Sequence, residues 1–580
     1  MASKRIVIIG AVALGPKVAC RLKRLRPQFE VTMIDQGEYI SYGGCGIPYY
    51  ISGDLSDLKE LMSTSFHMLR TPEFFAEAKG VHVRTRTRAL ALDRERRLLR
   101  VQDLATGREE DLPYDNLVLA TGARPRSLPI PGADLPGVMS VSGLPAAMAV
   151  RERVAKGEVA NAVIIGAGAI GVEMAEALSD LWGVEVAVVE LAPQVLPGML
   201  DPGLARMVQQ HLLDKDVSLY LQENVTEIRA LSGEEHSLEV VTTRQTLPAD
   251  LVITAVGVTP NSELARAAGL LVSPPGGIVV NRRLQTSDPD IYAGGDCIDN
   301  HHLLTGKLSH FPSGSLANRQ GRVIGSNLAG GCATFDGIVG SYALKVFELA
   351  VAGTGLNLKT ARQEGFDAVE ALVIQADRAH FYPTQDLMYL QLLVERKTRR
   401  LLGAHGLSHN GDALVGRINS IAALLPFKAD LQALSNLEVA YAPPFAAALD
   451  IVNALANTAE NTLDGFNRTI DVAEFEKCFL TDKAEDVICL DVRGAANAAP
   501  YVDLFGERWR NIPQETLKHR FGEIPGDKRL LVVCNSGVRS YEALLQLETA
   551  GLCNAVNLQG GVAALKKSGL LNLSDTGDQE

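Results

Sequence analysis

The sequence predicts an α/β protein, and three observations support this. A buried strand followed by a glycine-rich turn and a helix occurs twice in the first half of the chain, and strands alternate with helices again near its end. The predicted architecture is two nested Rossmann-like domains, an α+β domain and a small C-terminal α/β domain. A chain of 580 residues with 47% hydrophobic residues is long enough for several such cores.

The first strand–turn–helix pattern begins at Arg5–Ile9, an apolar run typical of a buried parallel strand. Gly10 and Gly15 follow it in a GxGxxG-like spacing, with Val12 at the middle glycine. A tight turn at Gly10 and a helix N-terminus beyond it favour binding of a pyrophosphate. The next strand ends in Asp35, which is well placed to bind a ribose hydroxyl.

The second pattern is complete, because Gly166, Gly168 and Gly171 follow the strand that begins at Ala162. Glu190 ends the next strand, nineteen residues after Gly171. A carboxylate at this position accepts a hydrogen bond from a ribose 2′-hydroxyl and repels a 2′-phosphate, so NADH is favoured over NADPH.

Each fingerprint is followed by a similar marker, first LATGARPR, whose Thr121 and Gly122 we expect to contact the cofactor, then ITAVGVTPN at 253–261. A third marker, TSDPDIYAGGDC, returns to the first unit, and its Gly295 and Asp296 suit contact with a ribityl chain or phosphate. One nucleotide-binding unit is therefore inserted in the other.

A single cysteine, Cys45, lies in SYGGCGIPYY at 41–50 among three glycines. Position 50 is Tyr, so no second cysteine stands at a dithiol spacing and Cys45 would act alone, as a thiolate that forms a mixed disulfide, persulfide or sulfenic acid. The alternative is a small buried core cysteine.

This order of motifs resembles the two-dinucleotide-binding-domain flavoprotein disulfide reductases over residues 4–454. The resemblance implies FAD on Gly10, Gly15, Asp35 and Asp296, and NADH on the second fingerprint and Glu190. Ser41, Tyr42, Cys45, Ile47, Pro48 and Tyr49 match the branch of coenzyme A-disulfide reductases, persulfide reductases and NADH oxidases and peroxidases. The oxidases and peroxidases carry histidine at the position of Ala13, which disfavours peroxide chemistry here; the coenzyme A-disulfide reductases usually carry Asn at the position of Gly44.

Residues 331–452 mix strands with a helix and resemble the dimerisation domain of that family, which implies a homodimer. In related enzymes, tyrosines at the positions of Tyr441 and Tyr382 reach the partner subunit's active site, where a phenol can donate a proton to a leaving thiolate. The alternative is a core or interface tyrosine. The resemblance further implies that basic residues on the first helix, Arg21, Lys23 and Arg24, together with Ser41, bind coenzyme A; a solvated helix face is the alternative.

A second reactive cysteine, Cys534, ends an apolar strand and begins CNSGVRS before a helix. Successive amides and a helix N-terminus in such a loop favour an anion at the sulfur, and Arg539 adds positive charge. With Asp491–Arg493 upstream and Gly560-Gly561 downstream, residues 469–572 resemble a rhodanese domain, which implies a sulfurtransferase site.

These features favour an FAD-dependent, NADH-using reductase of coenzyme A persulfide, polysulfide or related sulfane sulfur, with Cys534 accepting sulfur. A coenzyme A-disulfide reductase with an independent rhodanese domain, or a redox-sensing flavoprotein acting through a partner, are the alternatives. A net charge of −12 disfavours nucleic acid as a partner, the eight cysteines show no metal-binding spacing, and no apolar run is long enough to span a membrane, so we expect a cytoplasmic protein.

We expect six segments. They are an FAD-binding part at 1–149, an NADH-binding domain at 150–285, the return of the FAD-binding domain at 286–330, the dimerisation domain at 331–452, a linker at 453–468 and the rhodanese-like domain at 469–572.

Overall fold

The computed structural model describes residues 3–231 and 237–571. Residues 1–2, 232–236 and 572, which belong to three of the predicted segments, lie outside the described residues. The chain divides into two compact units, one made of 1–189 with 223–338 and the other of 190–222 with 339–580. Each unit is described by itself.

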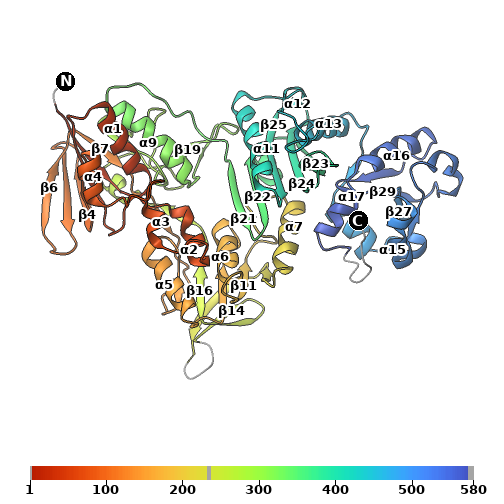
Figure 1. Ribbon diagram of the computed structural model, residues 1–580, viewed down its shortest axis with the longest axis horizontal. Helices are drawn as coiled ribbons and strands as arrows, with labels where there is room; N and C mark the ends of the chain where they lie inside the picture. Colours follow the sequence, from red (N-terminus) through yellow and green to blue (C-terminus); the bar gives the residue numbers. More distant parts are fainter. Residues whose placement is uncertain (1–2, 232–236, 572–580) are drawn as a thin grey trace. The chain divides into compact units, whose positions relative to one another are not determined.

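The first unit contains a five-stranded sheet in the order β18-β7-β1-β2-β3, and all of its strand pairs are parallel. Helices α1 (Leu14–Leu25) and α9 (Gly314–Leu328) pack against each other beside it (Figure 1). An antiparallel sheet, β4-β5-β6, follows β3. The strands are β1 (Arg5–Ile9), β2 (Glu30–Ile34), β3 (His82–Arg84), β4 (Thr87–Asp93), β5 (Leu98–Asp103), β6 (Glu109–Pro113), β7 (Asn116–Leu119) and β18 (Ile291–Ala293).

A second parallel arrangement in this unit places β10 between β11 and β16, with β9 beyond β16. An antiparallel sheet, β13-β14-β15, and helices α5 and α6 accompany it. The bounds are β9 (Val138–Met139), α5 (Leu144–Ala155), β10 (Asn161–Ile165), α6 (Ala169–Ser179), β11 (Glu185–Glu190), β13 (Val225–Ala230), β14 (Leu238–Thr242), β15 (Thr246–Ala249) and β16 (Leu251–Thr254).

The two halves of this unit are joined by a short antiparallel pair of strands, β8 (Ala123–Pro125) with β17 (Val258–Pro260). These strands lie within the first two markers that the sequence repeats, so the two markers pair with each other in the fold.

The second unit begins with α7 (Pro202–Leu213) and β12 (Ser218–Leu221). Its main sheet is antiparallel throughout, in the order β21-β22-β25-β24-β23. Helix α11 packs on β22 and β25, and α13 packs on β23 and β24. The bounds are β21 (Tyr342–Val346), β22 (Leu349–Gly355), α10 (Leu358–Gln363), β23 (Ala368–Ala376), β24 (Leu387–Glu395), β25 (Leu401–Ser408), α11 (Gly411–Leu424), α12 (Leu431–Ser435) and α13 (Ile451–Leu463).

The C-terminal part of this unit is a parallel sheet in the order β26-β30-β29-β27-β28 (Figure 1). Its core is built from apolar side chains of β27 and β29 against α16. The bounds are β26 (Thr469–Ile470), α14 (Val472–Phe475), the π-helical turn η3 (Glu476–Thr481), β27 (Val487–Asp491), α15 (Ala495–Phe505), β28 (Trp509–Asn511), β29 (Arg529–Val533), α16 (Val538–Thr549), β30 (Ala555–Leu558) and α17 (Gly561–Lys567).

The predicted α/β fold class is confirmed. Most of the stretch expected to be a linker, 453–468, forms helix α13, which buries Leu455, Ala456 and Ala459 against the antiparallel sheet. The domain boundaries themselves stay a prediction. Within the described ranges, no helix has the length and apolar composition needed to span a membrane.

Candidate active sites

The exposed thiol of Cys45 lies in a short 3-10 turn, Gly44–Gly46, that precedes helix α2 (Ile47–Ser52). Of the neighbouring glycines only Gly46 is required by packing, because a Cβ there would lie 2.3 Å from Leu61 Cδ2. At Gly44 the nearest atom to such a Cβ is 4.0 Å away. The cysteine thus lies in an open turn that a bulky thiol can approach, and its exposure excludes the alternative of a buried core cysteine.

The start of helix α9 faces this thiol. A Cβ on Gly314, the first residue of α9, would lie 3.7 Å from Cys45 Sγ. The backbone amides at a helix N-terminus carry partial positive charge, which stabilises a negatively charged sulfur. Ser313 and Gly314 are absent from the sequence-based site because they lie far from Cys45 along the chain, and no local pattern connects them.

The first fingerprint folds as the sequence predicts. A Cβ on Gly10 would lie 2.0 Å from Ala120 O, and one on Gly15 would lie 2.0 Å from Gly10 O, so both positions require glycine. Asp35 Oδ2 accepts a hydrogen bond from Ala11 N at 2.7 Å, and Oδ1 accepts one from Gly37 N at 2.8 Å. This turn fits the pyrophosphate of FAD, although Val12 occupies the position of the middle glycine.

The third marker borders the same sheet. Gly295 N donates to Gln320 Oε1 at 2.7 Å, and Asp296 Oδ1 accepts from Ser313 N at 3.0 Å. Burial raises the pKa of Asp296. Because Ser313 precedes Gly314, Asp296 also fixes the end of α9 that faces Cys45.

Thr121 and Gly122 have a structural role that the sequence reasoning did not assign. Thr121 Oγ1 donates to Asn261 O at 2.6 Å, Asn261 Nδ2 donates to Thr121 O at 2.8 Å, and Asn261 N donates to Gly122 O at 2.9 Å. These bonds tie the first two markers together. Their predicted contact with a cofactor stays a prediction.

The second fingerprint is more open. Gly166 and Gly171 are crowded, since a Cβ on Gly171 would lie 1.9 Å from Gly166 O, but a Cβ on Gly168 would meet nothing within 4 Å. That space at the N-terminus of α6 suits a pyrophosphate. Glu190 ends β11, and its Oε1 accepts a hydrogen bond from Ala192 N at 2.8 Å.

The residues predicted to bind coenzyme A have different surroundings. Arg21 Nε donates to Ser326 Oγ at 3.1 Å on α9, and Lys23 Nζ donates to Phe29 O at 2.9 Å; both side chains are half-buried, whereas Arg24 is exposed. Ser41 is buried with a positive φ of 51°, and its N–H donates to Ala11 O at 2.7 Å. Their contact with coenzyme A stays a prediction.

The second cysteine, Cys534, is buried in a loop between β29 and α16. Its Sγ accepts hydrogen bonds from Gly537 N at 3.1 Å and from Ser540 Oγ at 3.3 Å. Two donors aimed at one sulfur stabilise its anionic form. Ser540 was not predicted as a site residue, although it is the last residue of the CNSGVRS motif and lies in the first turn of α16.

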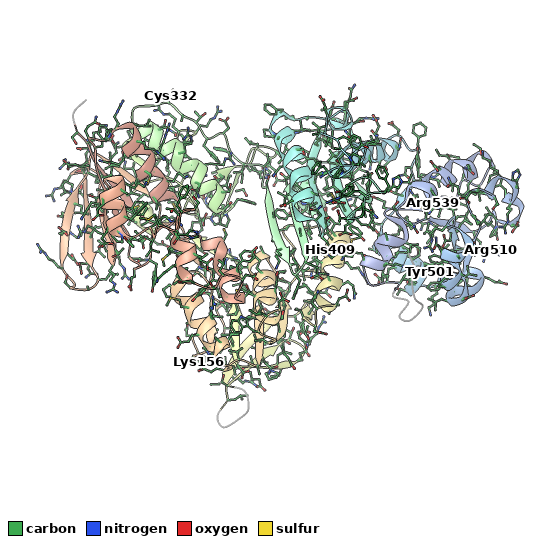
Figure 2. The ribbon with its side chains drawn as sticks, in the orientation of Figure 1. Lys156, Cys332, His409, Tyr501, Arg510 and Arg539 are labelled. Carbon is green, nitrogen blue, oxygen red and sulfur yellow. The ribbon has the colours of Figure 1, made fainter. Side chains whose placement is uncertain are left out.

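Arg539 is half-buried in the first turn of α16 (Figure 2). Arg493, which the sequence offered only as part of a marker, has a clearer place: its Nε and Nη2 bind the buried Asp491, with Nη2–Oδ2 at 2.7 Å. Its guanidinium carbon stands 5.0 Å from the ring centroid of Tyr501. Arg493 also lines the cavity described next, with its charge paired to that of Asp491.

A cavity of about 1840 Å³ lies within the second unit, beside the Cys534 loop. The C-terminal part contributes Arg493, just after β27, and Asn535–Val538, between β29 and α16, to its wall; His380 and Phe381 come from the loop between β23 and β24, and Tyr441 comes from the segment before α13. Tyr441 is exposed. The ring centroid of Tyr382 lies 5.9 Å from the guanidinium carbon of Arg378. The cavity exceeds the usual size of a small-ligand pocket, about 300–1,000 Å³, so it has room for a large carrier molecule.

Comparison with known proteins places these features in a family. The profile described as pyridine nucleotide-disulphide oxidoreductase matches residues 4–320, the profile for the dimerisation domain of that family matches 342–452, and the profile described as a rhodanese-like domain matches 471–568.

Individual relatives cover either the reductase part or nearly the whole chain. The NAD(P)H coenzyme A polysulfide/persulfide reductase of Pyrococcus horikoshii is 35% identical over 78% of this chain and 98% of its own. The structure of an NAD-dependent persulfide reductase from A. fulgidus matches with a TM-score of 0.90 and 37% identity over 97% of this chain and 99% of that one. Reduced Bacillus anthracis CoADR-RHD matches with a TM-score of 0.87 and 31% identity over 98% of each chain. This chain therefore belongs to the pyridine nucleotide-disulphide oxidoreductase family and carries a C-terminal rhodanese-like domain.

Proposed function

We propose that the protein is an NADH-dependent, FAD-containing reductase of coenzyme A persulfide or related sulfane sulfur, in which Cys45 performs the reduction and Cys534 accepts sulfur. The observation that carries this proposal is the contrast between the two thiols. Cys45 is exposed in an open turn, and Cys534 is buried between two hydrogen-bond donors.

The Cys45 thiolate would attack the inner sulfur of a persulfide R–S–SH. The sulfur–sulfur bond breaks, hydrosulfide leaves with the electron pair, and Cys45 is left in a mixed disulfide with R. Bound FAD would supply the two electrons, taken from NADH, that reopen this disulfide. The thiol RSH then leaves, and the amides at the start of α9 stabilise the restored Cys45 thiolate.

A small thiol would link the two sites. The cavity beside Cys534 is large enough for a carrier of the size of coenzyme A, and the named activity of the Pyrococcus horikoshii relative involves coenzyme A. Sulfur captured on Cys534 would pass to this thiol and form the persulfide that Cys45 reduces. We propose that the enzyme works as a homodimer, since the dimerisation domain is present, and that Tyr441 donates a proton to the leaving thiolate in the partner's site.

A coenzyme A-disulfide reductase is the second candidate, because the structure of Bacillus anthracis CoADR-RHD spans the same length of chain. An open thiol such as Cys45 suits either substrate. NADH oxidation should be compared with coenzyme A persulfide, coenzyme A disulfide, peroxide and oxygen, anaerobically for every acceptor except oxygen. Faster turnover with the disulfide than with the persulfide would reverse the assignment.

A further inference from the structure

The side-chain amide of Gln559 connects the rhodanese-like domain to the edge strand of the antiparallel sheet. Strand β23 is the edge of its sheet, and an edge strand leaves alternate N–H groups without a partner strand. Gln559 Oε1 accepts a hydrogen bond from Leu372 N of β23 at 2.7 Å. Its Nε2 donates to Thr469 Oγ1 at 3.1 Å, so both ends of the amide are used.

The next residue, Gly560, is pressed against the same strand. It has a φ of +74°, and a Cβ there would lie 2.8 Å from Ile374 Cδ1 and 3.2 Å from Leu372 Cδ2. The backbone of the turn before α17 therefore rests directly on side chains of β23 (Figure 1 labels both elements).

The same turn also holds the loop of Cys534. A Cβ on Gly561 would lie 2.3 Å from Cys534 O. Val562 N donates to Cys534 O at 2.8 Å, and Ala563 N donates to Asn535 O at 2.9 Å. Consecutive residues from 559 to 563 thus connect β23 with the sulfur-accepting loop, without a flexible segment between them.

We propose that Gln559 is a positioning residue that fixes the Cys534 loop to β23, so that sulfur acceptance depends on docking of the rhodanese-like domain on this chain's own dimerisation domain. This inference rests on the proposed function of Cys534. In that step the Cys534 thiolate attacks the outer sulfur of a donor R–S–SH. The sulfur–sulfur bond breaks, RS⁻ leaves with the electron pair, and Cys534 becomes a persulfide without net oxidation.

The test compares Gln559→Met with Gln514→Met in the full-length protein. Gln514 donates to Glu542 at 2.6 Å on the same domain, so Gln514→Met removes one side-chain hydrogen bond, whereas Gln559→Met removes two, those with Leu372 N and Thr469 Oγ1. Inorganic polysulfide is the probe, NADH is omitted, and the one-sulfur mass increase on the Cys534 peptide is followed in time. We expect Gln559→Met to slow this step about tenfold, the cost of one unsatisfied buried donor, and Gln514→Met to change it less than twofold. Gln559→Glu keeps an acceptor for Leu372 N and should recover most of the rate.

A second readout separates positioning from general loss of structure. Hydrogen exchange at the amides of Val562 and Ala563 should accelerate in Gln559→Met and not in Gln514→Met, and NADH oxidation with preformed coenzyme A persulfide should stay at the parent rate. Ile374→Ala, which loosens the contact with Gly560 from the other side, should act in the same direction. Equal sulfur uptake and equal exchange in the two methionine variants would overturn the proposal. If the parent chain takes up no sulfur on Cys534, the proposed function fails, and the exchange measurement alone decides whether the coupling exists.

Discussion

Replacement of Ser540 by Ala should slow sulfur acceptance at Cys534 about tenfold. Ser540 is fully buried, and its hydroxyl is one of two donors to Cys534 Sγ, at 3.3 Å beside the 3.1 Å bond from Gly537 N. A hydrogen bond to a charged group contributes about 1.5–3 kcal/mol, and the long oxygen–sulfur distance favours the lower end. A loss of about 1.5 kcal/mol of thiolate stabilisation corresponds to about a tenfold slower reaction.

The assay is the rate constant for formation of the Cys534 persulfide, followed by mass spectrometry with polysulfide in excess and no NADH. Ser536→Ala is the matched control, because it removes a hydroxyl from the same loop without removing a donor to Cys534. Turnover with preformed coenzyme A persulfide should be unchanged in both variants. A Ser540→Ala rate within twofold of the control would refute the view that this hydroxyl stabilises the reacting sulfur.

Three further predictions test the reductase part and the stability of the fold. Cys45→Ser should still purify with FAD but lose NADH oxidation with coenzyme A persulfide, whereas the exposed Cys332→Ser should keep it; activity in Cys45→Ser would show that electrons leave by another route. The parent should favour NADH over NADPH in kcat/KM by about tenfold or more, and Glu190→Gln should reduce this ratio, because a neutral amide does not repel a 2′-phosphate. Burial raises the pKa of Asp201 to about 6, so the folded state binds a proton more tightly than the unfolded state, and stability should fall as pH rises from about 4 to about 6, by up to about 3 kcal/mol. Asp201→Asn keeps an oxygen that can accept from Leu358 N and should flatten that slope in urea titrations; an unchanged slope would exclude Asp201 as its source.

The parallel strands were predictable because their signal is local. Arg5–Ile9 forms a strand with the bounds that its apolar run predicts. Helix α13 was not predicted because its Asn and Thr residues are typical of a linker. Its buried Ile451, Leu455 and Ala459 repeat every four residues, the period of a helix face, and could have revealed it.

The candidate sites show even more clearly that a sequence predicts only what a local pattern determines. Cys45 and Cys534 were predicted from short motifs, because glycines and helix starts near a cysteine have a direct chemical meaning. Gly314 beside Cys45, and the contact of Gln559 with Leu372, join segments that are distant in sequence. Such contacts follow from how whole elements pack, and a single sequence carries no local pattern for them.

The different burial of the two thiols suits the step that we propose for each. In the proposed cycle Cys45 is joined to the whole carrier thiol and later frees it, so its turn has to admit a bulky group, and Gly44 leaves that space. Cys534 receives only one sulfur atom and can stay buried, provided that donors stabilise its charge. Exchange of these environments would fail on both sides: a buried Cys45 would exclude the carrier, and an exposed Cys534 would lose the two hydrogen bonds that favour its thiolate. The packing around each sulfur therefore fits the role that we propose for it: reduction at Cys45 and sulfur acceptance at Cys534.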